Sequence, residues 1–365
     1  MKVGILTFHC AHNYGAVLQC YATQEFLRSQ GHDVEVINYR PEYLVDSYRL
    51  FTKERLSRGR DNLFVFFKVL LVEILVFCSR YKRFKGFERF ITKRLNIGTV
   101  VSRETLPVDC DAYIIGSDQV WNPKITRGFD SVYFAYFPFP KGDKRYISYA
   151  ASMEAKSLSD EQVEFFKNNL GNFDSLSVRE DALQQLLQPL TGKSISQVLD
   201  PVLMASPQIW DSFSSDKDSV EKYVVVYQVR NHPDTVRIAH HIAAQIGAKV
   251  KVLMARVEFR PVEGADQTAT PEAFVDIIRN AACVVTTSFH GTAFSVVFNR
   301  PFYTVQLNDG WDTRSQSLLA SLGLEDRIVD VTSSPDFTTI DYTLANQKLE
   351  ELRHSSQEYL LSAIN

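Results

Sequence analysis

Residues 282–298 read ACVVTTSFHGTAFSVVF, and this stretch decides the fold. The apolar run 282–286 has the composition of a buried strand, and the pattern from Gly291 onward predicts a helix over 291–298. Ser288 and His290 lie between them. In an open α/β sheet, ligands bind where a parallel strand ends and a helix begins. A histidine there can carry a proton near neutral pH, although it can equally cap the helix or satisfy a hydrogen bond in the core.

The same alternation of strand and helix continues on both sides of this stretch. A segment rich in Pro, Ser and Asp follows Asp200 and separates two such sets of elements. We therefore predict an α/β fold with two Rossmann-like domains facing across a cleft. The predicted parts are an N-terminal domain at 1–200 with a helical insertion at 42–98, a C-terminal domain at 201–340, and a helix at 341–365 that packs back on the N-terminal domain.

Length and composition agree with two ordinary globular domains. The chain has 365 residues, which is more than a single hydrophobic core usually contains. Its formal net charge of −3 argues against a nucleic-acid-binding protein. Its 5 cysteines are widely spaced and form no CxxC pair, which favours reduced thiols over a zinc site. The sequence starts directly with an apolar strand pattern, so we expect no signal peptide and a cytoplasmic location.

One apolar segment allows two interpretations. Residues 63–78 carry only Lys68 and Glu73 as charges, and several lysines and arginines follow up to Lys85. The segment is shorter than the roughly 20 apolar residues that span a bilayer. It is either a helix packed inside the protein or a peripheral contact of 63–85 with the inner face of the membrane.

The first strand-to-helix turn, residues 9–15, is a candidate binding loop. Asn13 and Gly15 tolerate the backbone angles of a tight turn, and the following helix offers free N–H groups to an anion. Gln19 lies one helical turn further on and is a candidate for the cleft. The loop lacks the GxGxxG spacing of a dinucleotide site. A tight turn that binds nothing is the alternative.

A second candidate loop, residues 116–122, combines hydroxyl, carboxylate, amide and indole groups. Ser117, Asp118, Gln119 and Asn122 suit the hydroxyls of a sugar, and Trp121 suits stacking on a sugar face. The alternative is a loop held by its own hydrogen bonds.

Two arginines are candidates for binding an anion. Arg179 follows a short strand, and Arg314 follows Trp311, Asp312 and Thr313. A guanidinium can hold a carboxylate or phosphate through two parallel hydrogen bonds. Salt bridges to neighbouring acidic residues are the alternative. No cluster of metal-ligand residues is visible, so we expect neither a metal nor a cofactor.

Taken together, these segments resemble the polysaccharide pyruvyl transferase family. The matching pieces occur in order over nearly the whole chain, at 5–8, 13–19, 116–122, 148–152, 177–180, 199–201, 288–294, 314 and 322–324. The resemblance implies an architecture like glycosyltransferase-B. It also implies transfer of a pyruvyl group from phosphoenolpyruvate onto two hydroxyls of a sugar, giving a ketal and free phosphate.

The resemblance also assigns roles to residues. His290 would deliver the proton, and Arg179 would hold the donor. The expected substrate contacts are Asn13, Gly15, Gln19, Ser117, Asp118, Gln119, Trp121, Asn122, Ser288, Gly291, Thr292 and Arg314. The family pattern has an arginine where this chain has Ser288. Either Arg314, Arg300 or Lys124 replaces its charge, or this branch of the family uses a different donor.

The leading hypothesis is therefore a cytoplasmic enzyme that acts on a saccharide precursor of capsule, cell wall or exopolysaccharide, one carried on a lipid. Two alternatives stay open. One is a glycosyltransferase-like enzyme that uses a nucleotide sugar, for which Glu272 is the candidate ribose ligand. The other is a non-catalytic saccharide-binding protein of the assembly pathway.

Overall fold

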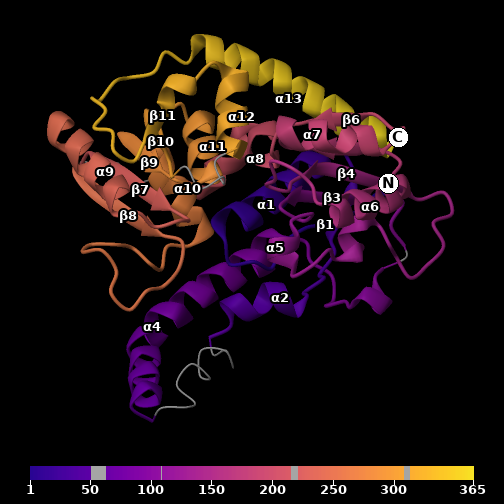
Figure 1. The fold of residues 1–365 in the computed structure, drawn as a ribbon, viewed down its shortest axis with the longest axis horizontal. Helices are drawn as coiled ribbons and strands as arrows, with labels where there is room; N and C mark the ends of the chain where they lie inside the picture. The colour runs from indigo at the N-terminus through magenta and orange to yellow at the C-terminus, as the bar shows by residue number, and fades with distance from the viewer. Residues whose placement is uncertain (51–62, 108, 215–220, 308–312) are drawn as a thin grey trace.

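The structure is a computed structural model that describes residues 1–50, 63–107, 109–214, 221–307 and 313–365. Its framework is two separate sheets in which every strand pair is parallel (Figure 1). The first sheet has the order β2-β1-β3-β4-β5-β6 and the second has the order β11-β10-β9-β7-β8. The prediction of an α/β fold with two Rossmann-like domains is confirmed.

The strands are short and mostly buried on both faces, as parallel strands covered by helices are. Those of the first sheet are β1 (Lys2–Leu6), β2 (Asp33–Val36), β3 (Ala112–Asp118), β4 (Arg145–Ala151), β5 (Leu176–Val178) and β6 (Ile195–Gln197). Those of the second are β7 (Tyr223–Gln228), β8 (Lys249–Met254), β9 (Cys283–Thr286), β10 (Phe302–Gln306) and β11 (Ile328–Asp330).

The order of the strands fixes where a ligand can bind. In both sheets the first strand of the domain lies between the second and the third. The chain therefore adds its later strands on the opposite side of the first strand, which makes a switch point between β1 and β3 in one sheet and between β7 and β9 in the other. The loops that leave such a switch point diverge and open a crevice at the carboxyl ends of the strands. The segments after β1, β3 and β9 are those that sequence analysis selected as candidate loops.

Helices cover the sheets and join the two domains. The longer ones are α1 (Tyr14–Ser29), α4 (Leu63–Arg94), α6 (Asp160–Asn169), α9 (Pro233–Ile246), α10 (Pro271–Arg279), α11 (Phe289–Val297), α12 (Thr313–Leu322) and α13 (Thr343–Ile364). The shorter ones include α2 (Glu42–Val45), α5 (Pro123–Thr126), α7 (Asp181–Leu187) and α8 (Pro201–Met204). Helix α13 returns to the first sheet, where the Tyr359 hydroxyl donates to the Ser148 carbonyl at 3.0 Å.

The predicted helical insertion at 42–98 is only partly helical. Its last residues, 95–98, are extended, because Ile97 pairs with Val36 in a parallel bridge and Asn96 donates through its side chain to the Val34 carbonyl at 2.7 Å. Residues 51–62 of the insertion lie outside the described residues.

Aromatic packing fixes the two domains against each other. Tyr14, at the start of α1, stacks on Phe274 of the second domain with ring centroids 4.4 Å apart. Arg83 of α4 lies over the Tyr14 ring and donates to the Tyr14 hydroxyl at 2.9 Å and to the Ala255 carbonyl at 2.8 Å. Further carbonyls of the second domain, on Met254 and Gln267, accept from the same guanidinium. Helix α4 is therefore bonded to both domains through one buried side chain.

Replacing this side chain should weaken the whole molecule. We predict that Arg83→Leu lowers the free energy of unfolding by roughly 2 to 4 kcal/mol, because several buried acceptors lose their charged donor. Lys93→Leu, an exposed change on the same helix, should change it by less than about 0.5 kcal/mol. Urea unfolding of both variants measures the difference, and equal effects would contradict the proposed role of Arg83.

Candidate active site

The first loop meets the second domain through a glycine. Helix α1 begins at Tyr14, and the Asn13 side chain caps it by accepting from the Gly15 N–H at 2.9 Å. Gly15 is helical and has no positive φ, so the expected unusual turn angles are wrong for it. The position requires glycine for another reason. A Cβ on Gly15 would lie 2.0 Å from Nδ1 of His290.

His290 lies at the carboxyl end of the second sheet. Ser288 is the N-cap residue of α11, so His290 is the second residue of the helix rather than part of the loop that sequence analysis expected. Its ring is 6% exposed. One face lies against Gly15 of the other domain, and Nε2 is 3.5 Å from Oδ2 of Asp200. That distance suits an ion pair and is long for a hydrogen bond.

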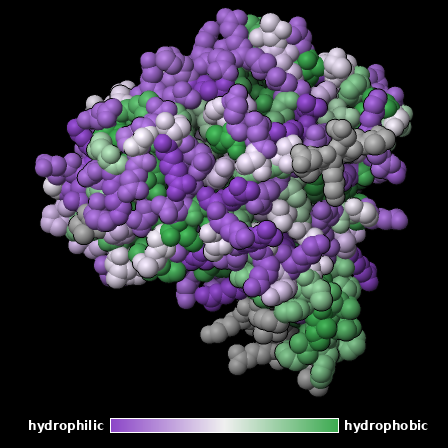
Figure 2. Space-filling model, turned by 180° about the vertical axis from the view of Figure 1, so that it is seen from behind, coloured by the Kyte–Doolittle hydropathy of each residue, from purple (hydrophilic) through white to green (hydrophobic). Residues whose placement is uncertain are grey.

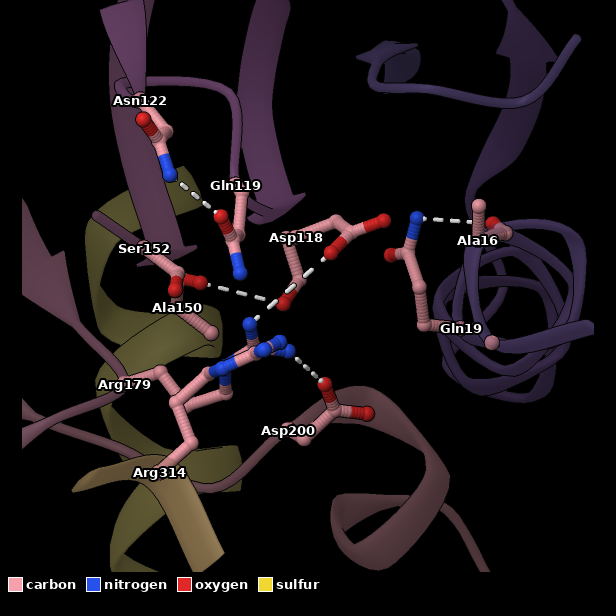
Figure 3. A network of polar contacts seen from close by, with 12 residues as sticks. Ala16, Gln19, Asp118, Gln119, Asn122, Ala150, Ser152, Arg179, Asp200 and Arg314 are labelled. Atoms are coloured by element: carbon pink, nitrogen blue, oxygen red, sulfur yellow. Dashed lines mark hydrogen bonds and ion pairs between the residues drawn. The ribbon is translucent and has the colours of Figure 1, made fainter. Parts of the chain in front are cut away.

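Arg179, directly after β5, is the centre of a buried charged cluster (Figure 3). Its Nη1 donates to Oδ2 of Asp200 at 2.5 Å, and its Nη2 lies 3.8 Å from Oδ1 of Asp118. The guanidinium also lies over the Phe289 ring, 4.7 Å from the centroid. Asp200 thus contacts both Arg179 and His290 through one oxygen, which links the end of β5 to the end of β9.

Arg314 of α12 brings a second guanidinium to this cluster. Figure 3 shows it beside Arg179, with Asp118 and Gln119 on one side and Asp200 on the other. Its Nη2 is 3.4 Å from Oε2 of Glu154. When the Gln119 amide is oriented to satisfy both groups, its oxygen accepts from Arg314 Nη2 at 2.9 Å and from Nη1 at 3.1 Å.

Of the three basic residues expected to replace the family arginine at the position of Ser288, Arg314 is the one that lies in the charged cluster (Figure 3). Arg300 is engaged at the other end of α11, where its Nε donates to the Phe298 carbonyl. Lys124 lies at the start of α5, and its backbone N–H donates to the Asn122 side chain.

Burial and charge shift several ionisations in the cluster. Burial favours a higher pKa for Asp200, but attraction to His290 and Arg179 more than offsets it, so the pKa of this carboxyl lies below its usual range. Burial raises the pKa of Glu180, although Arg179 and Ser152 favour its ionised form. Burial and repulsion from Arg179 lower the pKa of Arg314. Two like charges held this close out of water favour an anion between them.

Some buried polar atoms of the cluster have no hydrogen-bond partner within the described parts of the chain. They include Arg179 Nη2, Arg314 Nε and His290 Nε2. Leaving such groups unsatisfied is expensive, and unpaired groups gathered in one place indicate a site for a ligand. The three atoms come from β5, α12 and α11, so they converge only in the folded protein.

An open pocket of about 70 Å³ adjoins the cluster. Its walls come from both domains and from α13, and they include Arg179, Asp200, Phe289, Arg314, Ser317 and Ser356.

Four candidate site residues have structural positions instead. Trp121 is fully buried, stacks on Phe134 and donates to the Tyr133 carbonyl at 2.9 Å, so its predicted stacking on a sugar is wrong. Ser117 and Thr292 are fully buried and bonded to Ala150 and Thr304. The Asn122 side chain caps α5 and contacts Gln119.

The remaining candidates lie near the cluster. Gln19 donates to the Thr7 hydroxyl at 2.8 Å, and its Oε1 has no partner within the described residues. Gly291 packs on Thr286, where a Cβ would lie 2.2 Å from the hydroxyl oxygen, so it serves close packing of α11 on β9.

Sequence analysis missed Asp200, Glu154 and Phe289 as members of the site. Asp200 carried a signal, since an acidic residue before Pro201 is typical of a helix N-cap, and it does cap α8 through the Val202 N–H at 3.0 Å. Glu154 and Phe289 carried no comparable signal.

The histidines of the first loop lie outside this cluster. His12 contacts Glu88 at 2.9 Å, and His9 is bonded to Asn38 at 3.0 Å. Among the described residues, no group of three or more His, Cys, Asp and Glu side chains could hold a metal ion. Burial lowers the pKa of His9 to about 4, although its two acceptors oppose the shift.

We predict that removing the His290 ring makes room for a side chain at position 15. Gly15→Ala should lower the free energy of unfolding by about 1 to 3 kcal/mol through overpacking. In a His290→Ala background the same change should cost little, because alanine then favours the helix. Gly192→Ala, where a Cβ meets nothing within 4 Å, is the control. An equal cost of Gly15→Ala in both backgrounds would show that the contact is absent.

His9 should make stability depend on pH. Its folded pKa lies below the unfolded value of about 6.5, so the unfolded chain binds the proton first as pH falls. The contribution of neutral His9 to the free energy of unfolding is fully present above pH 6.5. It should fall by about 3 kcal/mol as the pH drops towards 4. His9→Gln should remove this part of the slope in unfolding measured across that range. An unchanged slope would contradict the buried neutral histidine.

The chain can be compared with known proteins by its sequence family and by its fold. The profile of the polysaccharide pyruvyl transferase family matches residues 13–308. No curated protein matches the chain. Solved structures with a remote likeness include a UDP-GlcNAc 2-epimerase of Methanocaldococcus jannaschii, with 11% identity over 99% of both chains and a TM-score of 0.46. The Neisseria meningitidis UDP-GlcNAc 2-epimerase has 9% identity over 100% of this chain and 94% of that chain, with a TM-score of 0.44.

The family match spans both domains and every segment that brings a side chain to the charged cluster except α12. The chain belongs to the polysaccharide pyruvyl transferase family.

Proposed function

We propose that the protein transfers a pyruvyl group from phosphoenolpyruvate onto two hydroxyls of a sugar in a surface-polysaccharide precursor, forming a cyclic ketal. The observation that carries the proposal is the convergence of unpartnered N–H groups from Arg179, Arg314 and His290 among the described residues. Two of them are permanently cationic and suit the carboxylate and phosphate of the donor. The third can give a proton.

The chemistry needs an acid beside the methylene carbon of the donor. His290 Nε2 donates its proton to that carbon, and the double-bond electrons form the new C–H bond. The adjacent carbon becomes oxocarbenium-like, and the first sugar hydroxyl adds to it and loses its proton. The proton of the first hydroxyl returns to Nε2. Phosphate then leaves with its bonding electrons, the second hydroxyl adds to the oxocarbenium carbon that results, and its proton leaves with the phosphate. Arg179 and Arg314 stabilise the negative charge of the donor and of the departing phosphate.

Asp200 would serve as a positioning residue for this acid. Its carboxylate lies close enough to Nε2 to stabilise an imidazolium, at 3.5 Å, and too far to hold the proton in a good hydrogen bond. Gly15 supports the other side of the ring. Asp200 and Gly15 therefore hold the ring from two sides, which would position Nε2 for a substrate.

Asp118, Gln119 and Gln19 would bind the acceptor sugar. They come from the ends of β3 and the start of α1, beside the switch point of the first sheet. Carboxylate and amide oxygens accept from sugar hydroxyls, and Gln19 Oε1 is unpartnered within the described residues.

The nucleotide-sugar alternative gains no support from Glu272. This carboxylate is 3.7 Å from Nε of Arg94, so the suggested ribose ligand is engaged with the end of α4.

Isothermal titration with phosphoenolpyruvate tests the proposal without knowledge of the acceptor. We predict saturable binding that Arg179→Ala and Arg314→Gln each weaken at least about tenfold, because each removes a charged contact to the donor. His290→Ala should retain binding and lose phosphate release in the presence of acceptors. Arg300→Ala is the matched control and should bind as the unchanged protein does.

Circular dichroism checks that each variant is folded. Absence of saturable binding, or equal weakening by Arg300→Ala, would contradict the proposed donor site. Saturable binding of a nucleotide sugar in its place would favour the glycosyltransferase-like alternative. Turnover that survives His290→Ala would exclude the histidine as the acid.

A further inference from the structure

The first half of α4 projects from the body of the protein and exposes apolar side chains. Figure 1 shows the helix extending away from both sheets, and Figure 2 shows its projecting part as a hydrophobic surface. Phe64 is 79% exposed and Ile74 is 62% exposed. The other large exposed apolar residues of this half are Val65, Phe67, Leu71, Leu75, Phe77 and Tyr81. An apolar surface of this extent marks a site of interaction.

Basic side chains continue the same exposed face further along the helix. Phe64, Phe67, Leu71, Ile74 and Leu75 are spaced by three, four or seven positions, which places them on one face. The same spacing continues through Cys78 to Lys82, Lys85 and Arg89, all of which are exposed. We call these residues the α4 stripe. Apart from Lys68, which is exposed at the same spacing, the stripe is apolar up to Cys78, and it is basic from Lys82 to Arg89.

The second half of the same helix is buried on its other face. Phe87, Phe90 and Ile91 are completely buried, and Arg83 bonds to both domains. The apolar first half is therefore held in a fixed direction by the packing of the second half. No helix among the described residues is long and apolar enough to cross a membrane.

We propose that the α4 stripe docks on a lipid surface that contains anionic headgroups. Phenylalanine, leucine and isoleucine enter the boundary between headgroups and acyl chains, and lysines and arginine at the end of the apolar part meet phosphate. The basic residues follow Cys78 by about 6 to 17 Å along the helix axis, which suits the step from the acyl boundary to the headgroups. Long lysine side chains can also extend from one region to the other.

Charge favours lipid over a second copy of this chain packed in parallel on the stripe. A second copy packed in parallel on the stripe would place Lys82, Lys85 and Arg89 beside the same residues of its partner, and no acidic side chain of the stripe offsets them. Anionic lipid offsets all three.

Helix α4 also contacts the loop that leads into α1, through residues on the face opposite the stripe. Glu88 of α4 contacts His12 at 2.9 Å, and Phe87 stacks on the same ring at 5.2 Å. His12 belongs to the loop that carries Gly15. Docking through the stripe would therefore hold the cleft near the membrane, which, on the proposed function, suits an acceptor carried on a lipid.

Sedimentation with vesicles tests the docking independently of any reaction. The full-length protein should sediment with vesicles of phosphatidylethanolamine and phosphatidylglycerol, and much less with phosphatidylethanolamine and phosphatidylcholine. The double variant Leu71→Glu and Ile74→Glu should abolish sedimentation. In Lys82→Gln and Lys85→Gln, each lost charge should lower partitioning onto anionic vesicles about fivefold. Leu344→Glu replaces an equally exposed leucine, 58%, on α13 and is the matched control.

Three results would overturn the proposal. The first is a wild-type protein that sediments with neither vesicle, and the second is a Leu71→Glu and Ile74→Glu variant that sediments as the wild type does. The third is a dimer in light scattering that this variant converts to a monomer, which would assign the stripe to a second copy. Binding of phosphoenolpyruvate by the stripe variants, measured in solution, separates failure of docking from failure of the proposed reaction.

Discussion

The imidazole of His290 packs directly on the backbone of Gly15, and the rest of the site depends on this contact between the domains. Any side chain at position 15 would occupy the space of the ring. The aromatic interface around Tyr14 and the bonds of Arg83 hold the two domains at the separation this contact requires. Because Gly15 confines one side of the ring, Nε2 is directed to the side where Asp200 lies.

The cluster around Arg179 buries several charged side chains together. Two guanidiniums and several carboxylates lie close together out of water, and some of their polar atoms have no hydrogen-bond partner within the described residues. Such an arrangement is poor for stability, because desolvation of each charge opposes its attraction to the others. On the proposed function, the anionic donor would accept hydrogen bonds from the N–H groups that have no partner within the described residues. Hydrogen-bond donors that have no partner in a site without water stabilise the charge of a bound ligand more strongly than they would in water.

Much of this fold follows from the sequence, and the site follows less well. Short apolar strands that alternate with capped helices predict two parallel sheets. The apolar strand before His290 predicts a ligand site at its carboxyl end. Residue roles in loops are harder, because burial depends on distant parts of the chain. Trp121 looks like a sugar-stacking residue in its loop, and only the packing of Phe134 shows that it belongs to the core. The importance of Asp200 arises from contacts with Arg179 and His290, which lie 21 and 90 positions away in the sequence. Gly15 was expected for its backbone freedom, whereas the fold needs its small size.

The central claim is that the anionic donor lies between Arg179 and Arg314 with its methylene carbon beside His290. A crystal structure of the protein soaked with phosphoenolpyruvate tests it most directly. The account predicts the carboxylate and phosphate on the two guanidiniums and the methylene carbon about 3 to 3.5 Å from Nε2. Phosphoenolpyruvate bound elsewhere, or bound with its methylene carbon directed away from His290, would contradict it.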